Sequence, residues 1–303
     1  MCLKVVVPSL FPFFILTTFL NASLFGFQIP GLRKLSTLLQ IPSNGESLLL
    51  LGLIGGYPVG AQLISDAYKA GQLNRKQSHI LLGYCSNAGP AFIFGITGVL
   101  FSSQWISFLL WGIHILSALF TGFLLPRPEK SAFSGYESTD ISIVTALRKS
   151  IFNCSSVCGW VITFKIIMAY IQKWASGFLS KEKLVILTGI LELSNGCVCL
   201  DQIHCESLRF ILCAAFLAFG GFCVMLQTAT VTESLGLGLY IPGKISQTAI
   251  SLLIAMFLSG FVFPDDHGRK IPYIITTLTC AIFIAVIKVC SKKICGNFEK
   301  INV

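Results

Sequence analysis

Glu192 is a carboxylate at the centre of residues 184–200, a segment that is otherwise uncharged and strongly apolar. Placing a carboxylate inside a bilayer costs on the order of 3 kcal/mol or more unless it is paired or protonated, so such a residue is functional by default. We predict that Glu192 couples to a cation, a proton or a substrate, with a purely structural role as the alternative. Lys165, in the preceding apolar run, is the candidate ion-pair partner unless its side chain reaches the outer interface instead.

Two apolar segments, residues 47–65 and 184–200, are each interrupted at their centre by residues that end one helix and begin another. Glycine just past a helix C-terminus adopts the left-handed conformation, and proline at the first helical position lacks only an N–H that would be unpaired anyway. In the second interruption, Ser194 and Asn195 are expected to N-cap the new helix. We therefore predict two re-entrant helical hairpins, each returning to the side from which it entered the membrane.

The hairpin tips are expected to meet two interrupted crossings, broken at Asn87-Ala88-Gly89-Pro90 and at Gly220-Gly221, near the middle of the membrane. There, free N–H groups at helix ends attract anions, and unwound carbonyl groups coordinate cations. The alternative for the glycines is that they only let helices pack closely. The predicted substrate- or ion-binding residues are Gly56, Tyr57, Pro58, Gly60, Asn87, Glu192, Ser194, Asn195 and Gln227.

Other polar residues carry weaker signals. His114 is interpreted as a hydrogen-bonded residue of the helix bundle and not as a proton relay. The spacing from Gly238 to Lys244 is that of a phosphate loop, but Ile245 follows where Ser or Thr is usual and no strand precedes it, so the match is treated as chance.

The 12 cysteines form no familiar metal-binding pattern. Cys197, Cys199, His204 and Cys205 lie close together, yet their spacing matches none of the common zinc motifs, so a packing role is favoured. Since catalytic motifs are also missing from the sequence, we predict no enzymatic activity, no cofactor and no metal.

The composition is that of an integral membrane protein. Only 12% of the 303 residues are charged, 54% are hydrophobic, and the mean hydropathy is +0.79. A soluble domain has roughly twice that charged fraction. The net charge of +9 comes from basic residues at the ends of apolar runs, which indicates topology signals and not a nucleic-acid surface.

The fold class expected is an all-α polytopic membrane protein with about seven crossings. With the C-terminus in the cytoplasm, most basic residues fall inside, the first hairpin enters from the cytoplasm and the second from outside. The expected crossings are residues 5–24, 77–101, 104–125, 151–171, 210–231, 245–263 and 271–289.

This order of elements predicts an inverted repeat. Residues 1–125 form the first repeat, with a basic amphipathic stretch at 31–40 ahead of its hairpin. Residues 126–140 are the linker, and residues 141–303 form the second repeat together with two C-terminal crossings.

Three motifs carry a resemblance to a known family: Pro8-Ser-Leu-Phe-Pro-Phe-Phe14, Gly56-Tyr-Pro-Val-Gly-Ala61 and Asn87-Ala-Gly-Pro-Ala-Phe-Ile93. They resemble the YlbJ-type sporulation integral membrane proteins, which carry a Gate (nucleoside-recognition) domain related to concentrative nucleoside transporters and to the ferrous-iron transporter B family. The resemblance implies an endospore-forming bacterium, location in the cell membrane and a role in spore cortex formation. Two departures stand out: the family usually has a further segment before the first motif, and nucleoside transporters have Gln-Thr-Glu at the first hairpin tip. The nucleoside substrate is therefore not carried over.

Two hypotheses follow. The first is secondary transport of a small polar solute, coupled to H⁺ or Na⁺, by a multi-pass protein of the bacterial cell membrane. The second is a non-transporting scaffold or assembly protein needed for spore cortex formation. Membrane lipid is an expected partner in both, nucleic acid is not, and a homo-oligomer is left open.

Overall fold

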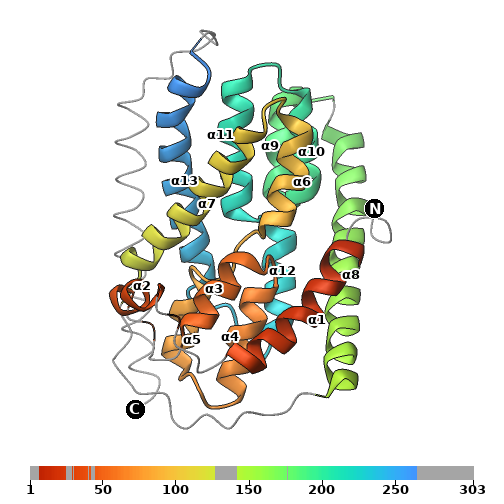
Figure 1. Cartoon of the computed structure of the whole chain (residues 1–303). Coiled ribbons are helices and arrows are strands. Elements are labelled where there is room, and N and C mark those ends of the chain that lie inside the picture. Colours follow the sequence, from red (N-terminus) through yellow and green to blue (C-terminus); the bar gives the residue numbers. More distant parts are fainter. Residues whose placement is uncertain are drawn as a thin grey trace.

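A computed structural model of the chain describes residues 7–24, 29, 31–39, 41, 45–126, 142–175 and 177–264, and every regular element in these ranges is a helix. The expected crossing at 271–289 and nearly all of the expected linker lie outside the described residues. The described helices form an elongated bundle (Figure 1).

Four helical stretches are long and apolar enough to cross a membrane: α7 (Gln104–Leu124), α8 (Ile143–Ala175), Glu206–Val231 and α13 (Tyr240–Val262). They coincide with four of the seven expected crossings, and the chain is a multi-pass helical membrane protein. α8 has 33 residues and so extends about 50 Å at the usual helical rise, well beyond a hydrocarbon core of about 30 Å.

The two segments expected to be hairpins each form a pair of short helices in contact. In the first, α3 (Glu46–Ile54) is followed by α4 (Val59–Lys69). In the second, α9 (Lys181–Leu191) is followed by α10 (Leu193–Cys199), and the single-turn helix η2 (Leu200–Gln202) comes next. The first pair lies in the lower half of Figure 1 and the second pair in the upper half.

Two of the expected crossings are interrupted. The segment expected at 77–101 forms α5 (Arg75–Leu82) and α6 (Pro90–Leu100), which are separated by the loop 83–89. Pro90 begins α6, as its fixed φ favours. The stretch Glu206–Val231 divides into α11 (Glu206–Phe219) and α12 (Gly221–Val231) because Gly220 and Gly221 have φ of +80° and +81°, values that favour glycine.

The remaining helices complete the bundle. α1 (Val7–Leu24) packs against α8, and the short α2 (Arg33–Leu38) against α3. Residues 101–103 join α6 to α7, and the exposed Trp105 follows them. The buried apolar residues form a first cluster, mainly between α1, α3, α4, α5 and α8, and a second, mainly between α6, α7, α9, α10, α11 and α13.

Hairpin packing depends on glycine at three positions. A Cβ on Gly52 or on Gly60 would lie 2.1 Å from the carbonyl oxygen of Cys85, so α3 and α4 both contact the backbone that follows α5. A Cβ on Gly196 would lie 2.2 Å from the Cα of Gly189, so α9 and α10 touch through their backbones. Small residues permit this close approach between membrane helices.

We expect Gly60→Ala to destabilise the protein by about 1–3 kcal/mol, because the added methyl group meets a backbone oxygen that cannot move aside. Gly98→Ala is the matched control, since Gly98 is also helical and a Cβ there meets nothing within 4 Å. The thermal unfolding midpoint in detergent, followed by tryptophan fluorescence, should fall only for Gly60→Ala. A fall of the same size in both variants would show that the close contact is not the cause.

Candidate functional site

The four helix interruptions meet in two pairs. A Cβ on Gly56, at the tip of the first hairpin, would lie 3.3 Å from the backbone nitrogen of Gly89 in the α5–α6 loop. A Cβ on Gly221, between α11 and α12, would lie 3.2 Å from the backbone nitrogen of Leu193 at the second hairpin tip. A Cβ on Gly220 would lie 3.3 Å from the ring of Tyr57, which links the two pairs. The four interruptions therefore lie close to one another within the bundle.

Tyr57 joins the first hairpin to the second half of the chain. Its ring is 8% exposed, and its hydroxyl donates a hydrogen bond to the carbonyl oxygen of Leu217 over 3.3 Å. Leu217 lies in the last turn of α11, where carbonyl groups lack partners within the helix. The same hydroxyl oxygen accepts a hydrogen bond from Lys244 over 3.0 Å.

Lys244 lies at the centre of this region. Its side chain extends from α13, is 2% exposed, and donates to Gln247 Oε1 over 2.7 Å and to Asn87 Oδ1 over 3.4 Å as well as to Tyr57. The amine also lies 4.9 Å from the centroid of the Tyr57 ring, within range of a cation–π contact. Within the described residues, every hydrogen-bond acceptor around this amine is a neutral oxygen.

Gln247 and Asn87 extend the network to His114. Gln247 Nε2 donates to Asn87 Oδ1 over 2.9 Å and to the carbonyl oxygen of His114 over 3.4 Å. The N–H of Ala88, in the α5–α6 loop, donates to His114 Nε2 over 3.1 Å, so this ring nitrogen is an acceptor. Tyr57, Asn87, His114, Lys244 and Gln247 form the central polar cluster.

Only part of this cluster was predictable from the sequence. Tyr57 and Asn87 are among the predicted site residues, and the interpretation of His114 as hydrogen-bonded within the bundle is confirmed. Lys244 entered only as the end of a chance phosphate-loop spacing, whereas the structure buries its side chain. The missed signal was the spacing of Lys244 and Gln247, which share one face of a helix in an otherwise uncharged run.

Glu192 is buried at the tip of the second hairpin, with 2% of its surface exposed. Its two carboxylate oxygens accept hydrogen bonds from the backbone N–H groups of Ser194, over 2.9 Å, and Asn195, over 2.7 Å. Glu192 is thus the N-cap of α10, and the expectation that the Ser194 and Asn195 side chains form the cap is corrected. The suggested partner Lys165 lies on an exposed face of α8.

The other predicted site residues have different surroundings. Pro58 is the N-cap of α4, and Gly60 packs against the backbone of Cys85. Gln227, on α12, is 5% exposed and donates to the sulfur of Cys223 on its own helix over 3.3 Å. Across the residues that the structure describes, no group of three or more His, Cys, Asp or Glu side chains could hold a metal ion.

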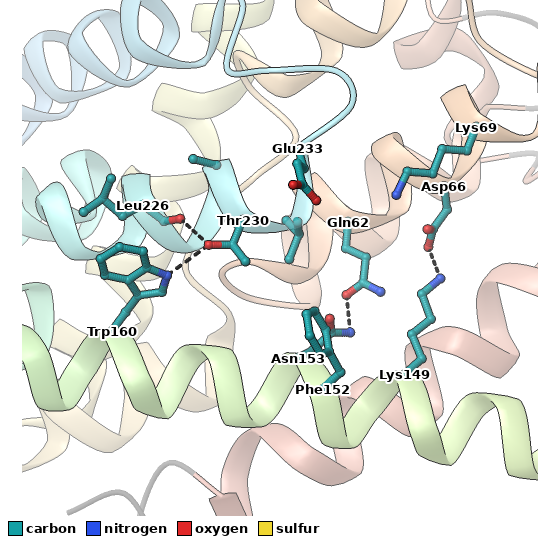
Figure 2. Close-up of a pocket in the computed structure, with 12 residues that line it drawn as sticks. Gln62, Asp66, Lys69, Lys149, Phe152, Asn153, Trp160, Leu226, Thr230 and Glu233 are labelled. Carbon is teal, nitrogen blue, oxygen red and sulfur yellow. Dashed lines mark hydrogen bonds and ion pairs between the residues drawn. The ribbon is translucent and has the colours of Figure 1, made fainter.

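A separate pocket of about 510 Å³ lies between α4, α8 and α12 (Figure 2). Asn153 Nδ2 donates to Gln62 Oε1 over 2.6 Å, and Lys149 forms an ion pair with Asp66. We call this the side pocket. Its polar lining residues are Gln62, Asp66, Lys69, Lys149, Asn153, Thr230 and Glu233, and its apolar ones are Phe152, Trp160, Leu226, Ala229 and Val231.

Comparison with known proteins finds one distant relationship. The chain is similar to the sporulation integral membrane protein YlbJ of Bacillus subtilis (strain 168), with 25% identity over 279 residues that cover 75% of this chain and 67% of that protein. The chain is thus a distant homologue of that protein, as the resemblance of its motifs implied. No protein-family model matches the chain, and no solved structure matches it.

We expect Glu192→Ala to lower the free energy of unfolding by about 1–2 kcal/mol, because two N–H groups of α10 lose their acceptor. Glu192→Gln keeps one acceptor oxygen and should cost less. Glu182→Ala, at an exposed position in the first turn of α9, is the control. Thermal unfolding in detergent measures all three, and an unchanged midpoint for Glu192→Ala would mean that the cap does not stabilise the hairpin.

Proposed function

We propose that this chain is a sporulation-associated integral membrane protein that transports a small polar solute by a secondary mechanism coupled to H⁺ or another cation. The observation that carries the proposal is the central polar cluster, which places a buried amine where helix interruptions meet inside a membrane bundle. An ionisable residue at such a depth marks a substrate or ion pathway by default. The name of the distant relative supports the link to sporulation.

The proposed architecture is an inverted repeat of the Gate type with two re-entrant hairpins. Each half has the same order: a helix pair, an interrupted helix and a long helix. The two helix pairs lie in opposite halves of the bundle (Figure 1), as inverted repeats require. Basic residues at the end that carries α4 and α5, including Lys69, Arg75 and Lys149, support a cytoplasmic location for that end.

Lys244 is the proposed coupling residue. Its amine is held by three oxygens from three elements: Tyr57 from the first hairpin, Asn87 from the α5–α6 loop and Gln247 from α13. Displacing the first hairpin breaks the contact with Tyr57 and frees one N–H of the ammonium group, which can then lose its proton or donate to water or to the oxygens of a solute. Because a ligand shifts a conformational equilibrium only by binding one state better, this exchange of partners links occupancy to hairpin position.

Glu192 is the second proposed coupling residue. Both of its oxygens are occupied by the cap of α10, so coupling there requires the cap to open. Gly56, Pro58, Gly60, Ser194, Asn195 and Gln227 complete the proposed site through their positions at or near the interruptions.

The surroundings of the bundle are proposed to be lipid. Large apolar side chains are exposed on several long helices, and in a bilayer these contact acyl chains without penalty. Examples are Phe108, Phe120, Phe257 and Phe261.

A scaffold without transport activity is the second candidate. It is favoured by the mutual bonding of the cluster: its members are at most 8% exposed, and the amine of Lys244 and the amides of Asn87 and Gln247 are hydrogen-bonded within the cluster in place of a ligand. In that case Lys244 fastens the two halves together, and the chain acts in sporulation through its assembly with other proteins.

Lys244→Met should abolish transport, lowering flux by about tenfold or more, since the apolar side chain cannot carry a proton or bind a solute oxygen. The purified protein is reconstituted into vesicles that contain a pH-sensitive dye, and a panel of polar solutes is added under an imposed pH or Na⁺ gradient. Lys181→Met, at the exposed start of α9, is the control. Full flux in Lys244→Met contradicts the coupling role. Vesicles of the unaltered protein that move none of the solutes favour the scaffold.

Glu192→Gln should also abolish transport while leaving expression and the unfolding midpoint close to normal, since it removes the charge and keeps one cap acceptor. The same vesicle assay measures this variant. Normal flux would leave Glu192 with a structural role only.

A further inference from the structure

The side pocket is distinct from the central polar cluster and has the size of a small-molecule site. Its volume of about 510 Å³ falls within the range that ligand pockets usually occupy. Three elements that are distant in sequence, α4, α8 and α12, supply its walls. Both Phe152 and Trp160 on α8 line it, so it offers apolar as well as polar surface (Figure 2).

The charges of the side pocket balance. Asp66 and Lys149 neutralise each other across α4 and α8. The other two charged residues of the lining are Lys69 and Glu233. Neither has a hydrogen-bond or ion-pair partner among the described residues. A ligand with one charge would match only one of them. A ligand with both charges matches both, and the pocket therefore favours a zwitterion.

A buried pair of amides lies between the two unpaired charges. Gln62 is 8% exposed and Asn153 is 5% exposed. Their mutual hydrogen bond uses Gln62 Oε1 and Asn153 Nδ2, which leaves Gln62 Nε2 as a donor and Asn153 Oδ1 as an acceptor. In the view of Figure 2, these side chains lie between Glu233 on one side and Lys69 on the other. A donor beside an acceptor is the complement of an amide group.

We infer that the side pocket binds a compact zwitterion with an amide between its charges, the chemistry of a dipeptide. The ligand's ammonium group pairs with Glu233, its carboxylate with Lys69, and its amide with Gln62 and Asn153. A zwitterionic lipid headgroup has the same two charges without the amide, so the two sources are separable. Binding of this ligand can be measured without transport and does not depend on the proposed function. Only the further step, that this ligand is the transported solute, rests on that function.

The test uses the full chain purified in detergent and three matched probes. These are L-alanyl-L-alanine, N-acetyl-L-alanine, which lacks the ammonium group, and L-alaninamide, which lacks the carboxylate. Isothermal titration should give a dissociation constant for the dipeptide at least about tenfold lower than for either analogue, which is the effect of losing one charge contact of about 1.4 kcal/mol.

Two substitutions assign the charges. Lys69→Gln should weaken dipeptide binding and remove the preference over L-alaninamide, while the preference over N-acetyl-L-alanine remains. Glu233→Gln should do the converse. Lys181→Gln and Glu182→Gln, both at the exposed start of α9, should change neither preference. Equal effects of both pocket substitutions on both analogues, or no binding of the dipeptide, overturn the inference.

A further experiment distinguishes a zwitterionic lipid headgroup from a soluble dipeptide as the ligand. The chain is placed in nanodiscs of phosphatidylethanolamine or of phosphatidylglycerol, and dipeptide binding is measured again. Unchanged binding in both supports a soluble ligand. Retention of phosphatidylethanolamine with no dipeptide binding in either overturns the amide-bearing ligand. Dipeptide binding without flux of any solute supports this inference and contradicts the proposed transport. Flux of other solutes without dipeptide binding supports the proposed transport and contradicts this inference.

Discussion

Helix ends inside a bilayer present N–H and C=O groups that water cannot reach, and the rest of this structure depends on how those groups are satisfied. At the second hairpin, the Glu192 carboxylate accepts from two N–H groups of α10. At the α5–α6 loop, the His114 ring accepts from the N–H of Ala88, and the Asn87 amide donates to the carbonyl of Tyr84. The polar side chains of the candidate site are therefore also the hydrogen-bond partners of the backbone groups at the helix interruptions.

This double use constrains any motion of the bundle. A side chain that leaves its backbone partner to contact a solute exposes a buried donor or acceptor, and such a group costs about 1–3 kcal/mol if it stays unpaired. A ligand with suitable polar atoms offsets that cost, and an apolar one does not. In the proposed transport, selectivity for polar solutes therefore arises from the backbone that they help to satisfy, without a dedicated recognition residue for each atom.

Local sequence patterns predicted the positions of the interruptions, because glycine and proline act on their own stretch of backbone. They also predicted four of the long apolar helices and the burial of an acidic residue at the second tip. The environment of Lys244 was not predictable in this way, since its partner Tyr57 is 187 residues distant in sequence. The side pocket was missed for the same reason: Gln62 and Asn153 are 91 residues apart, and each looks ordinary in its own helix.

Tyr57 lies in the first hairpin, yet its ring is packed in the second hydrophobic cluster, while its neighbour Val59 belongs to the first. The aromatic ring of Tyr57 thus joins the two hydrophobic clusters, because it extends from the first hairpin into the second cluster. Withdrawing the ring into water would cost about 1.5–3 kcal/mol, a modest barrier on the scale of protein conformational change. A cost of this size is within the binding energy of a small molecule, as the proposed transport requires.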